Sequence, residues 1–228
     1  MSKRTFIVIV SDESPTLLKQ DAIPIFDLIT YSYSGNSKQL GPGTLTSPLC
    51  HYTYQTAGLG ESLHLLGSLD ILADYTDVIF INGDVSISFL QINLWIFKIS
   101  CHNILWSQPS LSHDSKWSHP WTVHNSSSSL CRSSFVEAMV FSVPSQVLID
   151  YSKTPLLSYS SWGLDKYLFP YLFSYRQGSF LEGWVDHSCV VRHLRPIQSS
   201  KIIYPNGLTA FQELEVVKQR LSTGLLSI

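Results

Sequence analysis

Three polar residues, Asn82, Gly83 and Asp84, follow directly on the apolar run 78–81. This pattern predicts a buried strand whose carboxyl end carries ligand-binding groups. Carboxylates at such a turn can hold Mg²⁺ or Mn²⁺, which neutralises the charge of a bound diphosphate. Gly83 would let the backbone approach that ligand closely. The alternative is an ordinary turn, because all three residue types favour turns.

A second candidate is the stretch Trp162-Gly163-Leu164-Asp165, which sets a carboxylate in the first turn of a predicted helix, close to an indole ring. Asp165 could accept the proton of an attacking hydroxyl, and Trp162 could stack on a sugar ring. The alternative is that Asp165 only complements the positive end of the helix dipole.

A basic cluster, Arg192, His193 and Arg195, ends the last predicted strand. His193 is a candidate metal ligand, and the two guanidinium groups could pair with phosphate oxygens. The alternative is a solvated basic edge. Glu137 stands inside the apolar stretch 135–144, where a buried carboxylate needs a partner or a ligand, unless it faces water from an edge strand.

Other motifs are weaker. His113, Asp114, His119 and His124 crowd a polar connection over 113–132, but their spacing fits no regular helix or hairpin, so we do not predict a zinc site. No Walker loop, G-x-G-x-x-G, G-x-S-x-G or H-E-x-x-H is present. The sequence therefore contains none of these motifs that would indicate a kinase, a dehydrogenase or a hydrolase.

Composition limits the class of protein. The 228 residues are 44% hydrophobic with a formal charge of −2 and no long basic run, so we expect no nucleic-acid partner. The most apolar stretch, 87–100, is interrupted by Gln91, Asn93 and Lys98, which predicts no transmembrane segment. The apolar run near the N-terminus is too short for a signal peptide. We expect a cytoplasmic protein.

The elements that would position these residues alternate along the chain. Strands are predicted over 6–10, 25–35, 77–83, 104–111, 135–144 and 183–196. Helices are predicted over 59–69, 89–103, 144–153, 160–173 with a break before Pro170, and 208–221 with the capping box Thr209 and Gln212. A loop is predicted over 35–49. This order predicts an α/β fold, a mostly parallel central sheet flanked by helices, with ligands bound beyond the carboxyl ends of the strands.

Several stretches, taken in order, resemble a known family. They are FDLITYSYSG, YTDVIFINGDVSI, SQPSLS, TVHN, FVEAMVFSVPSQVL, SWGLDKYL and GWVDHSCVVRHLRP, and together they span roughly residues 5 to 197. The chain is similar to the glycosyltransferase-like family catalogued as domain of unknown function 707, which is related to GT-A-type nucleotide-diphospho-sugar transferases.

The resemblance implies a single GT-A-like, Rossmann-type domain over residues 1–228. A nucleotide-binding half would occupy about 1–110, an acceptor half about 111–200, and a C-terminal helix 208–228. The implied reaction moves a sugar from a nucleotide-diphospho-sugar donor to the hydroxyl of a carbohydrate or another acceptor, with help from Mn²⁺ or Mg²⁺.

The resemblance also implies roles for individual residues. Asp84 and His193 would bind the metal, Asp165 would be the catalytic base, and Glu137 matches a glutamate in a strand of the family. The donor would contact Asn82, Gly83 and Asp84, with Arg192 or Arg195 near its diphosphate and Asp12 and Asp27 near its nucleoside. Trp162 and Gly163 would face the acceptor. Relatives usually carry more acidic residues where Asn82 stands, so an inactive GT-A scaffold that binds nucleotides or carbohydrates is the alternative function, and an unrelated α/β domain with ordinary turns is the alternative fold.

Overall fold

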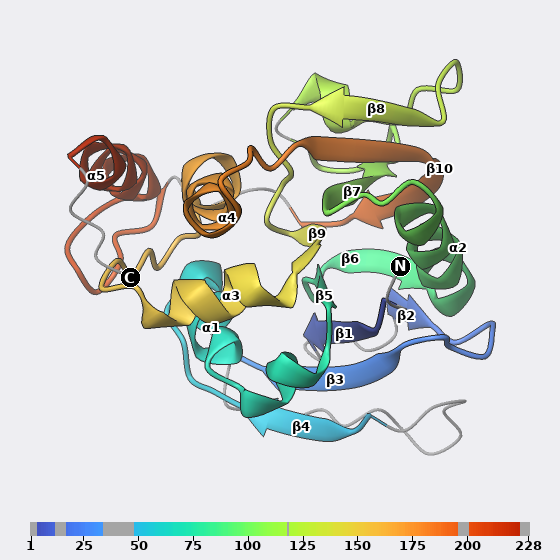
Figure 1. The fold of residues 1–228 in the computed structure, drawn as a ribbon, viewed down its shortest axis with the longest axis horizontal. Coiled ribbons are helices and arrows are strands. Elements are labelled where there is room, and N and C mark those ends of the chain that lie inside the picture. The colour runs from blue at the N-terminus through green and yellow to red at the C-terminus, as the bar shows by residue number, and fades with distance from the viewer. Residues whose placement is uncertain (1–3, 12–16, 34–47, 118, 196–200, 224–228) are drawn as a thin grey trace.

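A computed structural model describes residues 4–11, 17–33, 48–117, 119–195 and 201–223 of the chain (Figure 1). The strands are β1 (Phe6–Ser11), β2 (Leu18–Lys19), β3 (Asp27–Ser32), β4 (Cys50–Thr53), β5 (Asp77–Ile81), β6 (Val85–Ser88), β7 (Trp106–Leu111), β8 (Leu130–Ser133), β9 (Val140–Pro144) and β10 (Gly183–His193). The helices are α1 (Leu59–Gly67), α2 (Phe89–Cys101), α3 (Ser145–Lys153), α4 (Phe169–Gln177) and α5 (Ala210–Ser222). Short helical turns are η2 (Asp70–Asp74), η3 (Pro120–Thr122) and η4 (Leu164–Leu168).

The strands form one mixed sheet in the order β2-β6-β10-β7-β9-β5-β1-β3-β4, with β8 added beside β10. β1 lies parallel to β3 and β5, and β3 lies parallel to β4, as expected for a Rossmann-type half. β9 runs antiparallel to both β5 and β7. β10 also lies parallel to β7, and β2 lies parallel to β6. The predicted α/β fold is therefore confirmed, with a sheet that mixes parallel and antiparallel pairs.

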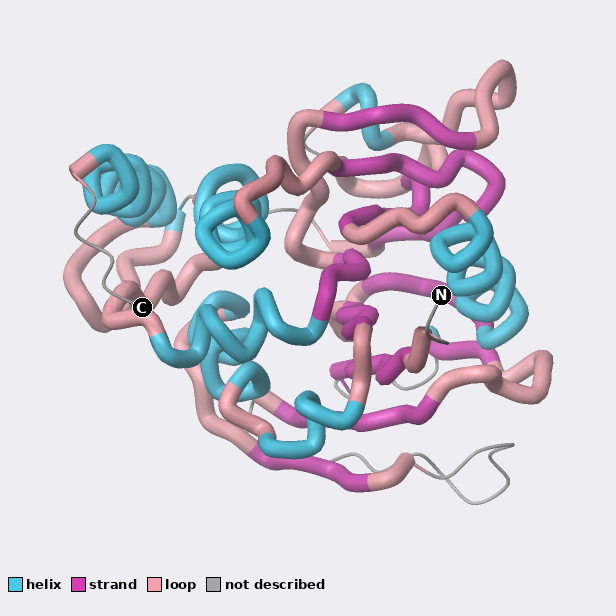
Figure 2. The backbone as a smooth tube through the Cα atoms, viewed as in Figure 1, coloured by secondary structure: helices cyan, strands magenta, loops and turns pink. Residues whose placement is uncertain are grey.

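The apolar residues of the strands are buried on both faces of the sheet. Side chains alternate along a strand, so Ile7 and Val78 join one core cluster while Val8 and Ile79 join the other. The first cluster packs under α1, α3 and α4, and the second packs under α2. Figure 1 and Figure 2 show α1, α3, α4 and α5 gathered on one side of the strands and α2 on the other. Burial on both faces explains why these strands are apolar throughout.

Some predicted elements differ from the structure. β4 and β6 were not predicted, because each has only four residues and the residues of β4 are at best half-buried, so neither leaves a clear periodic signal. β9 covers only the second half of the predicted strand 135–144, and Glu137 precedes it. The predicted break before Pro170 corresponds to the change from the π-helical turn η4, which ends at Leu168, to the α-helix α4, which begins at Phe169. Pro170 lies in the first turn of α4, where proline needs no hydrogen-bond partner for its nitrogen.

Within the described ranges, no helix has both the length and the apolar character needed to cross a bilayer.

Candidate active site

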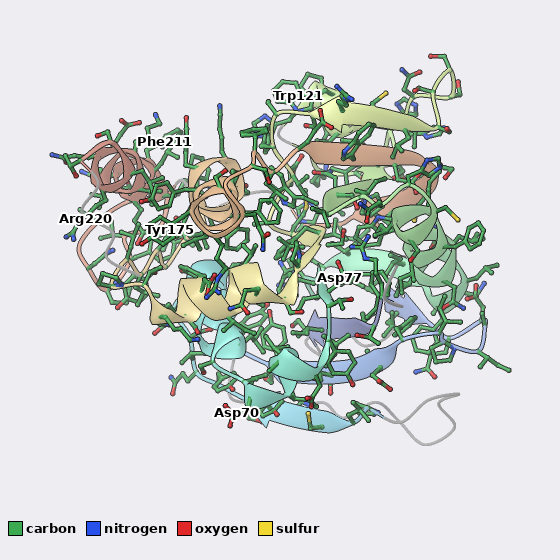
Figure 3. All side chains as sticks on the ribbon, viewed as in Figure 1. Asp70, Asp77, Trp121, Tyr175, Phe211 and Arg220 are labelled. Carbon is green, nitrogen blue, oxygen red and sulfur yellow. The ribbon has the colours of Figure 1, made fainter. Side chains whose placement is uncertain are left out.

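A cavity of about 560 Å³ opens where β5 ends, between that end of the sheet and the C-terminal helix α5. It brings together seven residues from the predicted set, which are Asn82, Asp84, Glu137, Trp162, Gly163, Asp165 and His193. Figure 3 shows Trp121 and Phe211, two aromatic residues of its wall that come from η3 and α5. The cavity therefore lies beyond the carboxyl end of the third predicted strand, where the sequence predicts that a ligand binds.

Asp84 and His193 form a pair at the sheet end of the cavity. Asp84 lies in the turn between β5 and β6, and His193 ends β10 in register with Val85. The Nε2 atom of His193 is 3.2 Å from Oδ2 of Asp84. Its Nδ1 donates to the carbonyl oxygen of Lys116 at 2.6 Å, which fixes the ring so that Nε2 faces the carboxylate.

The charge state of this pair follows from its partners. Burial by itself would lower the pKa of His193, but the hydrogen bonds to Asp84 and to the Lys116 carbonyl, with the negative charges of Asp84 and Glu137, raise it. Oδ1 of Asp84 is buried and has no hydrogen-bond partner. A buried carboxylate oxygen without a partner is costly, which makes it a candidate for binding a ligand.

These groups fit a divalent cation that shares its coordination with a substrate. No group of three or more His, Cys, Asp and Glu side chains in the described part of the chain has the geometry of a complete metal site. Mg²⁺ commonly needs only one or two protein carboxylates, because water and substrate phosphates supply the other ligands. The free oxygen of Asp84 and the imidazole of His193 match that incomplete type of site.

Asn82 and Gly83 belong to the same turn. The Asn82 backbone nitrogen donates to the Met139 carbonyl at 2.8 Å, and its carbonyl accepts from Val85 at 3.1 Å. These bonds hold Asn82 at the cavity wall, where its amide adds no charge to that of Asp84. Gly83 is not among the residues that line the cavity.

Glu137 has the partner that a buried carboxylate requires. Its Oε1 accepts from the Thr122 hydroxyl at 2.8 Å, and its backbone nitrogen donates to Gln108 Oε1 at 2.7 Å. Burial raises the pKa of the Glu137 carboxyl, while the bond from Thr122 and the nearby His193 act against that rise. Glu137 therefore lies in the cavity on an irregular segment before β9, and the position inside a strand was a wrong prediction.

Asp165 sits on an unusual backbone. Ser161 and Gly163 have positive φ values of 72° and 91°, and the π-helical turn η4 follows. The backbone nitrogens of both Tyr167 and Leu168 donate to the Gly163 carbonyl, at 3.1 and 3.0 Å. Strained backbone and π-turns are frequent at functional sites. This geometry places Asp165, a half-buried residue, at the wall of the cavity.

The environment of Asp165 suits a general base. Burial, followed by the negative charge of Glu137, raises the pKa of Asp165 to about 7, although backbone N–H groups of Ala138 and Lys166 donate to it. A base whose pKa lies near the working pH can both accept and release a proton. The pKa values of both carboxyl groups in the cavity, those of Glu137 and Asp165, are thus raised above those of ordinary surface acids.

The raised pKa predicts how stability depends on pH. Between pH 4 and 7 the folded chain holds a proton on Asp165 that the unfolded chain has lost, so the free energy of unfolding falls as pH rises. Asp165→Asn removes this penalty and should stabilise the protein at pH 8 by about 2 kcal/mol relative to wild type, with a much smaller gain at pH 5. Urea unfolding of both proteins at the two pH values, in EDTA, measures the difference. An equal gain at both values would contradict the assignment.

Gly163 has a structural reason to be glycine. Its φ of 91° disfavours other residues, and an added Cβ would lie 3.1 Å from Cβ of Val217 on α5. Gly163→Ala should therefore lower the free energy of unfolding by about 3 kcal/mol. Gly178→Ala is the matched control, because its φ is 65° but nothing surrounds the site, and it should cost only about 1 kcal/mol. Equal losses in urea unfolding would mean that α5 does not press on Gly163.

Besides Gly83, the structure places three predicted residues, Asp27, Arg192 and Arg195, outside the cavity lining. Asp27 begins β3, at the amino end of the sheet, and accepts from the Tyr75 hydroxyl at 2.8 Å. Arg192 alternates with His193 along β10, is exposed and pairs with Asp114 at 2.9 Å. Arg195 donates to the Tyr33 hydroxyl at 3.1 Å. Asp12 lies outside the described residues.

Other cavity residues were not predicted. Lys166, next to Asp165, adds a positive charge at the wall. His119 and Trp121 come from the connection that the sequence suggested was only polar, and Tyr204 and Phe211 come from the C-terminal part of the chain. Phe211 contacts Trp162 edge to face at 4.6 Å between ring centroids. No local pattern marks these residues, because they meet only through long-range packing.

No protein-family model and no curated protein sequence matches the chain. Membership of the family catalogued as domain of unknown function 707 therefore stays a prediction.

Two solved structures are similar in fold. A crystal structure of GalNAc-T7 with UDP, GalNAc and Mn²⁺ has a TM-score of 0.59 at 9% identity, covering 96% of this chain and 48% of that one. A crystal structure of S. aureus TarS 1–349 has a TM-score of 0.56 at 12% identity, covering 96% of this chain and 64% of that one. The chain thus spans about half and just under two-thirds of these proteins. At such identities the likeness concerns the fold, and the chain has the fold of GT-A glycosyltransferases.

Proposed function

We propose that the protein is a glycosyltransferase that moves a sugar from a nucleotide-diphospho-sugar donor to an acceptor hydroxyl. The observation that carries the proposal is one cavity that combines the pair Asp84 and His193 with the carboxyl groups of Asp165 and Glu137. The GT-A fold supports it, because the cavity lies at the sheet edge where α/β folds bind their ligands.

The donor would bind at the sheet end of the cavity. Asp84, through its unpartnered oxygen, and His193 would hold Mn²⁺ or Mg²⁺, and Asn82 would lie beside them. The bound ion would neutralise the charge that develops on the departing diphosphate. Lys166 replaces Arg192 and Arg195 in this proposal as the positive side chain at the cavity wall, since both arginines have partners outside it.

The acceptor would bind between Asp165 and the aromatic wall of Trp162, Trp121 and Phe211. Asp165 takes the proton of the acceptor hydroxyl, and the hydroxyl oxygen forms a bond to the anomeric carbon. The bond from that carbon to the diphosphate oxygen breaks, and the nucleoside diphosphate leaves with the bonding electrons. Attack opposite the leaving group would invert the anomeric configuration. Glu137 would keep Asp165 basic through its charge.

The proposed donor and acceptor ends correspond only in part to the two proposed halves of the domain. Asn82 and Asp84 belong to the donor half, about 1–110, and Trp162 and Asp165 belong to the acceptor half, about 111–200. His193 also belongs to the acceptor half, although it would hold the metal beside Asp84 at the donor end. The C-terminal helix closes the cavity from the side.

An inactive GT-A scaffold that binds nucleotides or carbohydrates is the second candidate. Asn82 favours it, because an amide contributes no charge to a metal site. The raised pKa of Asp165 favours the enzyme, because holding a carboxyl group in that state costs stability that simple binding does not require.

Calorimetric titration with UDP, GDP and CDP, each with and without Mn²⁺, tests the proposal. Metal-dependent binding of one nucleotide is expected, followed by release of that nucleotide when its sugar conjugate is mixed with an array of methyl glycosides. Binding without any turnover would favour the scaffold. Absence of binding for all three nucleotides would overturn the glycosyltransferase and favour the inactive scaffold.

A further inference from the structure

Glu213 on α5 is a buried carboxylate that does not line the cavity. Its side chain is 2% exposed and its two oxygens accept hydrogen bonds from four groups. Oε1 accepts from the Tyr159 backbone nitrogen at 3.0 Å and from the Asn206 amide at 2.7 Å. Oε2 accepts from the Ser160 backbone nitrogen at 2.7 Å and from the Ser158 hydroxyl at 3.3 Å.

These bonds join α5 to the segment that enters the cavity. Ser160, held through its nitrogen by Glu213, accepts at its own hydroxyl from the Trp162 backbone nitrogen at 3.1 Å. Ser161 follows with its positive φ, and Asp165 comes directly after Gly163 and Leu164. Only Ser161, whose backbone is strained, therefore lies between Trp162 and Ser160, the residue that Glu213 contacts.

Other contacts of α5 act on the same segment. Phe211 packs edge to face on Trp162, and Val217 lies where a side chain at Gly163 would project. Apolar packing of this kind stabilises the helix but leaves it free to shift or rotate slightly. Directional hydrogen bonds from backbone nitrogens fix a position more tightly than apolar contacts do. A buried carboxylate is also an expensive way to obtain stability alone, since apolar residues of similar volume often serve as well.

We propose that Glu213 is a positioning residue that holds Trp162 and Asp165 in register with the donor end of the cavity. This inference rests on the proposed glycosyltransferase function and assigns to α5 the task of setting the acceptor geometry. Misplacement by about 1 Å far from the reacting atoms can cost roughly 100-fold in rate, so loss of Glu213 should act on transfer while leaving donor binding intact.

The test compares three variants. Glu213→Gln keeps the shape of the side chain but offers one acceptor oxygen instead of two. Glu215→Gln is the matched control on the same helix, because Glu215 is exposed and its side chain pairs with Lys218 on the surface. Leu221→Ala lowers the stability of α5 at its far end, where Leu221 packs on the core without lining the cavity. For each protein we would measure kcat, both KM values, the Kd for UDP with Mn²⁺, the Tm, and hydrogen exchange of residues 158–165.

For Glu213→Gln we expect kcat to fall or the acceptor KM to rise roughly 10–100-fold, with the nucleotide Kd within about twofold of wild type and faster exchange over 158–165. Glu215→Gln should match wild type, and Leu221→Ala should lose Tm with little change in turnover. If Leu221→Ala loses activity in proportion to its Tm as Glu213→Gln does, Glu213 is only structural and the proposal fails. Wild-type activity in Glu213→Gln would also overturn it.

The two proposals can fail separately. A wild-type protein that turns over none of the donors defeats the glycosyltransferase function, and hydrogen exchange then decides whether Glu213 positions the segment. Unchanged exchange over 158–165 in Glu213→Gln would overturn the positioning role whatever the activity.

Discussion

The Asp165→Asn variant is expected to lose about 10²- to 10⁴-fold in kcat for sugar transfer while it keeps its affinity for the nucleoside diphosphate. Asparagine has nearly the same shape as aspartate, and its side-chain oxygen can still accept hydrogen bonds from the backbone N–H groups of Ala138 and Lys166. It cannot take a proton from the acceptor hydroxyl. The loss should therefore appear in the chemical step rather than in the binding of the donor.

The measurement is steady-state release of nucleoside diphosphate, together with calorimetry of nucleotide binding. Asp70→Asn is the matched control, because Asp70 is exposed and lies far from Trp121 in Figure 3. Wild-type kcat in Asp165→Asn would exclude this residue as the base. In that case Glu137, the other carboxyl group with a raised pKa in the cavity, would be the residue to test next. The stability gain of Asp165→Asn at pH 8 shows in the same samples that the variant is folded.

The Asp84→Ala variant is expected to lose metal-dependent nucleotide binding by at least about 100-fold, and turnover with it. Asp84 carries the buried oxygen that has no partner in the protein, and it also orients His193. Removing it deletes the charged ligand of the proposed cation and leaves the imidazole held only through Nδ1 and Lys116. The diphosphate would then meet the cavity without its counter-charge.

Calorimetry of UDP, GDP and CDP in Mn²⁺ measures this loss, and Asp70→Ala serves as the control. Replacing His193 with glutamine should give a smaller loss, because Asp84 would still supply a charged oxygen. Unchanged activity in Asp84→Ala would defeat the assignment of the donor site. Unchanged binding with lost turnover would instead place Asp84 in the chemical step.

The sequence alone determined the parts of this protein that depend on local pattern. The unbroken apolar run of β5 predicted a strand buried on both faces, and the turn Asn82-Gly83-Asp84 predicted polar groups at its carboxyl end. The capping box of Thr209 and Gln212 predicted the start of α5. Each signal lies within a few residues, because strand periodicity and helix capping are themselves contacts over a few residues. Side chains alternate along a strand, so the adjacent positions of Arg192 and His193 in β10 also indicate that the two side chains face opposite sides of the sheet.

Only the tertiary structure decided which of these groups meet. His193 reaches Asp84 because β10 pairs with β6, Glu137 finds Thr122 across the connection before β9, and Glu213 reaches Ser160 from the C-terminal helix. Asp27 fails to join them because it begins its strand rather than ending it. Such contacts join residues that are far apart in the chain. They form because the whole sheet and its two apolar faces fold cooperatively, so no short stretch carries a signal for them.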